Sequence, residues 1–107
     1  MKIRMKPPKA QEFIKEIEAH LPLPVHLTPE AAHSLRQQGK NARADETLQV
    51  NSVMDSGELG GILCVIEVEG GNIVISLTHV RIGVDHPLKA RIEAYQRARV
   101  RKLSRQR

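Results

Sequence analysis

Aromatic side chains are nearly missing from this sequence of 107 residues, which has one phenylalanine, one tyrosine and no tryptophan. Single-strand binders of the RRM and OB types stack bases on several exposed rings. Phe13 and Tyr95 cannot supply such a platform, and Phe13 falls on the apolar side of a predicted helix. The sequence therefore argues against recognition by base stacking and predicts a core built from aliphatic side chains.

Cysteine is equally scarce, because Cys64 is the only one. A single cysteine cannot form an intramolecular disulfide or a zinc site built on paired cysteines. No apolar run approaches the roughly 20 residues that cross a bilayer, and no apolar segment of a signal peptide follows the basic N-terminus. We therefore expect a cytoplasmic protein that does not associate with a membrane.

The composition, with 40% hydrophobic and 27% charged residues, is that of a globular protein. The length predicts one domain over residues 1–107. Within it, we expect residues 1–7 to form an N-terminal arm and residues 102–107 to fray.

Helical periodicity marks the first part of the chain and its end. Apolar residues recur at helical spacing over residues 8–20, and Thr28 followed by proline marks the start of a second helix ending near Gly39. A third helix is predicted from Pro87 into the last residues. Its expected apolar stripe consists of Leu88, Ile92, Tyr95 and Leu103.

Between the helices the apolar pattern changes to a period of two, which predicts strands at residues 48–51, 62–69 and 72–82. A hairpin turn centred on Gly70 and Gly71 places Ile66 opposite Ile75 and Cys64 opposite Leu77. The core face of this hairpin is then almost wholly apolar. The fold class is α+β: a three-stranded antiparallel meander with two N-terminal helices and a long basic C-terminal helix, in the order α-α-β-β-β-α.

The C-terminal segment carries the excess positive charge. Residues 87–107 hold eight of the 17 Lys and Arg residues and one of the 12 Asp and Glu residues. We predict that one set of these residues contacts nucleic-acid phosphates. The predicted nucleic-acid-binding set is Arg91, Arg97, Arg101, Lys102 and Arg105. Two alternatives remain open, namely contact with an acidic protein and simple stabilisation of the helix C-terminus by cations.

The second face of the hairpin predicts an interface between two copies. Apolar side chains away from the turn form a patch of the kind that marks interfaces. The predicted interface residues are Leu63, Val65, Val74, Val80 and Ile82. The competing interpretation is that the helix starting at Thr28 covers this patch.

Signals for catalysis and metal binding are weak. Cys64 and His79 fall on one predicted sheet face, where a histidine can activate a thiol, but that face is aliphatic and predicted to be covered. The five histidines form no metal-binding pair at helical spacing. Gly57, Gly60 and Gly61 indicate a turn rather than a phosphate loop, because no Lys-Ser or Lys-Thr follows. We expect no metal, cofactor or catalytic residue.

Three hypotheses follow for function. The first is a small non-enzymatic binding protein that contacts DNA or RNA phosphates through its basic helix. The second is a dimeric regulatory or scaffold subunit that binds another protein. The third is a small enzyme that depends on Cys64 and His79.

Overall fold

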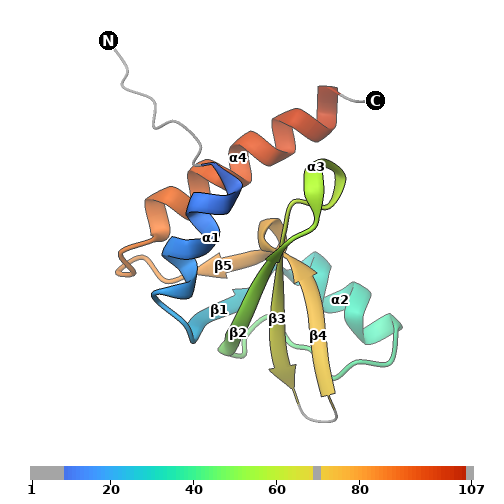
Figure 1. Cartoon of the computed structure of the whole chain (residues 1–107). Coiled ribbons are helices and arrows are strands. Elements are labelled where there is room, and N and C mark those ends of the chain that lie inside the picture. The colour runs from blue at the N-terminus through green and yellow to red at the C-terminus, as the bar shows by residue number, and fades with distance from the viewer. Residues whose placement is uncertain (1–8, 69–70, 106–107) are drawn as a thin grey trace.

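The computed structural model describes residues 9–68 and 71–105 as an α+β fold with three main helices and a five-stranded antiparallel sheet (Figure 1). The elements are α1 (Ala10–Glu18), β1 (Leu23–Leu27), α2 (Pro29–Gln37), β2 (Leu48–Asp55), the one-turn helix α3 (Gly57–Gly60), β3 (Ile62–Val68), β4 (Gly71–Ser76), the 3-10 turn η1 (Leu77–His79), β5 (Val80–Ile82) and α4 (Lys89–Arg105). The predicted α+β class is confirmed, whereas the prediction of three strands is wrong.

Some of the predicted features lie outside the described residues. These are the N-terminal arm over residues 1–7, the turn residue Gly70, and residues 106 and 107 of the segment expected to fray. Within the described ranges, none of the helices has both the length and the apolar character needed to cross a bilayer.

The strand missing from the prediction is β1, which lies inside the sheet in the order β4-β3-β2-β1-β5. Leu23, Val25 and Leu27 are buried and alternate with more exposed residues, as in any half-buried strand. Pro24 concealed this pattern, because proline has no N–H to donate to a ladder. The strand accommodates Pro24 where it pairs with Gln49 of β2, since pairing with β5 begins only at Val25.

The second unpredicted strand is β5, because the apolar pattern predicted one continuous strand over residues 72–82. The Ser76 hydroxyl accepts a hydrogen bond from the N–H of Thr78 at 3.2 Å, and this local turn interrupts the strand. After the turn, the chain pairs with β1 instead of β3. As a result, β4 and β5 are the two edges of one curled sheet.

The pairing of β3 with β4 is shifted by two residues from the predicted register. Ile66 lies opposite Ile73, where the prediction placed Ile75. Because side chains alternate with a period of two, this shift leaves every side chain on its predicted face. The predicted core face is therefore correct, except that Val68 is half-buried and His79 lies exposed in η1.

β2 is longer than predicted, and the prediction fell short because the alternation of apolar residues is interrupted within the strand. The register against β3 shifts between Val50 and Ser52, as in a β-bulge. The shift brings Val53 to the core face together with Val50, three residues earlier. The period of two is lost after Asn51 for this reason, which is why the predicted strand stopped there.

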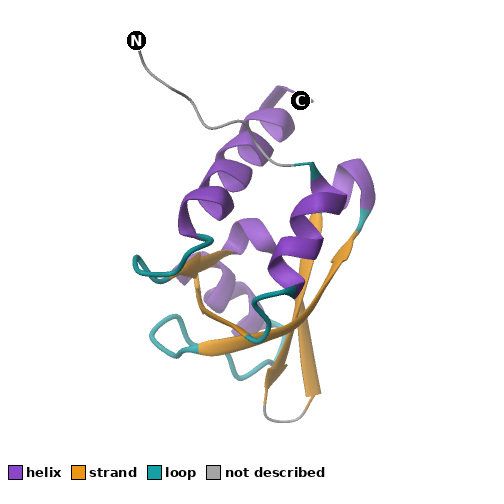
Figure 2. Cartoon of the chain, turned by 60° about the vertical axis from the view of Figure 1, so that its left-hand side comes forward, coloured by secondary structure: helices purple, strands orange, loops and turns teal. Residues whose placement is uncertain are grey.

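Both N-terminal helices form where their sequence signals predict them. The Thr28 hydroxyl accepts the N–H of Ala31 at 3.2 Å and caps α2. α1 buries Phe13 and Ile17 completely and lies against α4, with the Phe13 and Tyr95 ring centroids 6.0 Å apart (Figure 2). This shared aliphatic and aromatic core positions α4, the element that carries the predicted site.

Candidate nucleic-acid interface

α4 buries one apolar stripe and then extends beyond the sheet. Leu88, Ile92 and Tyr95 are buried in the core that α4 shares with α1 and the sheet. Leu103 was expected to continue this stripe, but its side chain is 42% exposed. The reason is that the last turns of α4 lie past the body of the sheet (Figure 1). The stripe therefore holds the first half of the helix and leaves the second half projecting.

The first half of α4 pairs its cations with carboxylates of the same chain. Lys89 Nζ lies 2.8 Å from Glu93 Oε2, and this hydrogen bond lowers the pKa of Glu93. Arg91 Nη2 lies 2.5 Å from Glu16 Oε2 of α1, and its guanidinium lies over the Phe13 ring. Arg91, a member of the predicted nucleic-acid-binding set, therefore ties α4 to α1.

A pair of histidines lies beside the start of α4. The rings of His20, after α1, and His86, before α4, have centroids 5.4 Å apart. His86 Nδ1 accepts the N–H of Leu88 at 3.0 Å. Partial burial and the neighbouring His20 lower the pKa of His86. Within the described ranges, no three His, Cys, Asp or Glu side chains gather closely enough to hold a metal ion.

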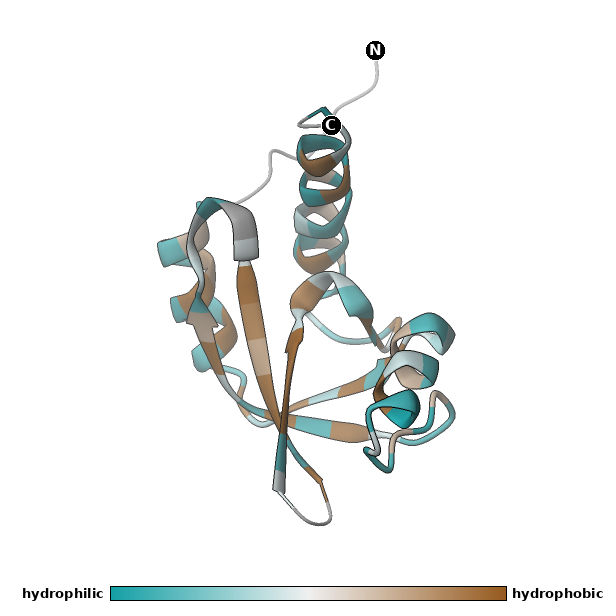
Figure 3. Ribbon diagram, turned by 90° about the vertical axis from the view of Figure 1, so that its right-hand side faces the viewer, coloured by the Kyte–Doolittle hydropathy of each residue, from teal (hydrophilic) through white to brown (hydrophobic). Residues whose placement is uncertain are grey.

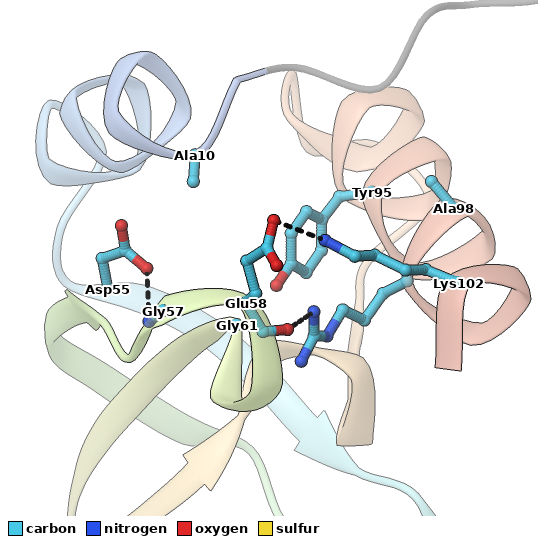
Figure 4. Close-up of a pocket in the computed structure, with 9 residues that line it drawn as sticks. Ala10, Asp55, Gly57, Glu58, Gly61, Tyr95, Ala98 and Lys102 are labelled. Carbon is cyan, nitrogen blue, oxygen red and sulfur yellow. Dashed lines mark hydrogen bonds and ion pairs between the residues drawn. The ribbon is translucent and has the colours of Figure 1, made fainter. Parts of the chain in front are cut away.

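Arg99, which is not among the predicted site residues, fixes α4 against α3. It is only 8% exposed, and its Nη1 donates to the backbone carbonyl of Glu58 in α3. One turn before Arg99, the Tyr95 hydroxyl accepts a hydrogen bond from the N–H of Ile62 at 2.8 Å. After Arg99, Lys102 Nζ lies 3.5 Å from Glu58 Oε1 (Figure 4). Arg99 lies one turn beyond Tyr95 on the apolar stripe, and this spacing is the signal that could have identified it.

Gly61 allows α4 to approach α3 this closely. Its φ of 67° and ψ of −151° lie in a region that is essentially restricted to glycine. A Cβ at this position would lie 2.6 Å from Tyr95 Oη and 2.9 Å from Arg99 Nε. Together with Gly57 and Gly60, it belongs to the connection between antiparallel strands β2 and β3, as the interpretation of these glycines as a turn predicted.

A pocket of about 400 Å³ lies between α1, α3 and α4 (Figure 4). It is lined by two carboxylates, Asp55 and Glu58, and by two cations, Arg99 and Lys102. The formal charges of these four side chains cancel. Lys102, the second member of the predicted set with an ion pair, thus contributes to a neutral site rather than to an excess of positive charge.

Arg97, Arg101 and Arg105 form what we call the arginine row, on the projecting half of α4. All three side chains are exposed, and no carboxylate of the described residues lies within ion-pair distance of them, although the charge of Arg97 contributes to the lowered pKa of Glu93. Successive members are about 6 Å apart along the helix, at a rise of 1.5 Å per residue. The cations that face the body of the protein are thus engaged there, and the excess charge collects in the row.

The five residues of the predicted dimer interface lie on two different faces of the sheet. Leu63, Val65 and Val74 lie on the outer face of β3 and β4, and Val74 is 54% exposed. Val80 and Ile82 are instead buried in the core, so their assignment to this face was wrong. The cause is η1, which redirects the chain so that β5 pairs with β1.

The fold does not bring Cys64 and His79 together. Cys64 lies opposite Ile75 in the hairpin and is completely buried, whereas His79 is exposed in η1. Burial raises the pKa of the Cys64 thiol to about 12. Such a thiol stays protonated near neutral pH, and the thiolate is the form that acts as a nucleophile.

The arginine row is thus the set of α4 cations that remains available to bind another molecule. Guanidinium groups bind phosphate oxygens through paired, charge-assisted hydrogen bonds, so the row offers chemistry suited to a polyanion. Arg91, Lys102 and Arg99 contact α1 or α3 instead and hold the helix there. Comparisons with protein-family models, with curated proteins and with solved structures find no match for this chain.

Proposed function

We propose that this chain is a non-enzymatic binding protein whose arginine row contacts the phosphate backbone of a nucleic acid. The observation that supports the proposal is the sorting of the cations on α4. Those facing the body have partners in α1, α3 or α4 itself, whereas the arginine row faces solvent on a projecting helix. Backbone contacts of this kind provide affinity and orientation without reading base sequence.

The dimensions of the row suit a phosphate backbone. Arg97 and Arg105 are eight residues apart, which is about 12 Å along the helix. A strand of duplex DNA places one phosphate every 3.4 Å along its axis, so about three to four phosphates lie within that span. Each of the three arginines can therefore contact a different phosphate, and we expect about three phosphate contacts per chain.

Three contacts predict a measurable dependence on salt. The logarithm of the affinity should fall with the logarithm of the salt concentration with a slope of about −2.7 for duplex DNA and about −2.1 for a single strand. Between about 50 mM and about 200 mM salt, the affinity for duplex DNA should therefore decrease about 40-fold.

The test is fluorescence anisotropy with labelled duplex DNA and labelled single-stranded RNA across a salt series. Replacing the arginine row in the triple variant R97Q/R101Q/R105Q should remove both the binding and its salt dependence. The control K9Q/K15Q/K40Q removes the same charge from exposed positions outside α4 and should keep the slope. Equal losses in the two variants, or no binding by the native chain at low salt, would refute the proposal.

A second candidate partner is an acidic protein, the first of the two alternatives that the charge pattern leaves open. It is favoured by Val100 and Leu103, which are 57% and 42% exposed beside the arginine row. A phosphate backbone does not cover such side chains, but a protein surface does. Two results would favour this alternative. One is that polyglutamate competes for the arginine row as well as DNA does. The other is that V100S/L103S weakens the capture of a protein partner without weakening the binding of DNA.

A further inference from the structure

The two edges of the sheet are protected to different degrees. β5 is three residues long and has the exposed Arg81 at its centre, and short charged strands of this kind resist pairing with other chains. β4 has six residues, Gly71–Ser76, with no charged residue and no proline. Its register against β3 has no bulge. β4 thus has none of the features by which exposed edges avoid association.

The edge of β4 is also open. Figure 3 views the molecule from this side, and none of the described helices crosses in front of the strand. Val74, at the middle of the strand, is 54% exposed on the outer face, next to the half-buried Val65 of β3. An uncovered strand with an apolar centre is a template for adding another strand.

The last five residues of β4 are symmetric about Val74. Residues 72–76 read Asn-Ile-Val-Ile-Ser, with isoleucines on both sides of Val74 and a small polar residue at each end. When a strand pairs antiparallel with itself about a two-fold axis, opposed residues share a face, so the axis must pass through a residue and not between two residues. An axis at Val74 aligns each residue with one of its own kind and pairs all five positions.

We propose that β4 pairs antiparallel with β4 of a second copy of this chain, with the two Val74 residues opposite each other. Asn72 of each copy then lies opposite Ser76 of the other, where amide and hydroxyl groups can exchange a hydrogen bond. The outer face acquires a continuous apolar row, because Val65 flanks Val74 in each copy. The product is one ten-stranded sheet whose remaining edges are the two protected β5 strands.

The symmetry and the lack of charge favour a second copy over an unrelated peptide as the occupant. An unrelated peptide needs no symmetry in β4, and an edge without charge gives it no electrostatic selectivity. The one carboxylate of β3 as described, Ile62–Val68, is that of Glu67 on the outer face, which lies opposite Asn72. In the proposed register, Glu67 and Asn72 of one copy lie in line with Ser76 and Leu63 of the other copy, so no like charges lie opposite each other.

The first test is the molar mass in solution, measured by size-exclusion chromatography with light scattering over a dilution series. The native chain should be a dimer that dissociates on dilution. V74K places two like charges opposite each other and should give a monomer. The control V84K makes the same change at a 77% exposed site outside the sheet and should remain a dimer. A native chain that is monomeric throughout, or a V74K variant that is still dimeric, overturns the proposal.

The second test identifies which residues lie opposite each other in the dimer, and it does so without destabilising the dimer. Thiols introduced by V74C should form an interchain disulfide under mild oxidation, because residues opposed in antiparallel strands have Cα atoms about 4.5–5.5 Å apart, within the range that a disulfide spans. N72C alone and S76C alone should not cross-link, whereas N72C/S76C should. The native Cys64 is completely buried and serves as the background. Equal cross-linking of N72C and V74C would overturn the register.

Discussion

The contact between α4 and α3 is tested by the substitution G61A. The added methyl group would lie 2.6 Å from Tyr95 Oη and 2.9 Å from Arg99 Nε, both far inside van der Waals contact. Both side chains are buried, so neither can move into solvent without breaking its own contacts. The substitution should therefore separate α4 from α3 as well as strain the backbone.

The expected loss of stability has two parts. Placing alanine at a φ of 67° and a ψ of −151° costs about 1–3 kcal/mol in strain. Displacing the Tyr95 hydroxyl leaves the N–H of Ile62 buried without its hydrogen-bond acceptor, which costs about 1–3 kcal/mol more. The sum of about 2–6 kcal/mol is a large part of the total stability of about 5–15 kcal/mol that is usual for a protein.

A matched control is available four residues earlier in the chain. Gly57 has a φ of 82°, and a Cβ there would meet nothing within 4 Å. G57A therefore shows strain alone, about 1–2 kcal/mol. Urea unfolding of both variants, followed by circular dichroism, gives the two free energies, and the midpoints should shift without a change in the slope.

A double-mutant cycle isolates the clash from the strain. Y95F removes the hydroxyl that the new methyl group meets, so G61A should be less harmful in a Y95F background by about 0.5–3 kcal/mol. Two results would refute the reasoning. One is a G61A variant no less stable than G57A, and the other is strict additivity of G61A and Y95F.

Two further predictions concern titratable groups. The pKa of His86 is lowered in the folded chain from its usual 6.5, so the unfolded chain takes up this proton first. Stability should therefore fall as the pH decreases through about 6.5 and level off below the folded pKa of His86. Urea midpoints across this range measure the effect, and H86N, which keeps a capping acceptor that does not titrate, should reduce it; an unchanged pH profile in H86N contradicts the assignment. Cys64, with a thiol pKa of about 12 and complete burial, should react with a chromogenic disulfide reagent near neutral pH only as fast as the chain unfolds, and an immediate reaction of the native protein contradicts this.

The sequence alone determined the local features of this protein. Thr28 followed by Pro29 predicted the start of α2, because a capping hydroxyl and a first-turn proline act within a few residues of each other. The period of two in β3 and β4 predicted which side chains are buried, and it did so despite the wrong register. The concentration of charge in the last helix was likewise visible by counting.

Tertiary structure decided the features that depend on partners distant in the chain. Whether Pro24 belongs to a strand depends on where β5 starts to pair with β1, and whether Val80 is buried depends on the turn that separates β5 from β4. The fate of each cation depended on the same kind of contact, since Arg91 meets a carboxylate 75 residues earlier and Arg99 reaches a carbonyl 41 residues earlier. Periodicity and capping act over one or two turns of helix, whereas pairing and burial are settled only when separate elements meet.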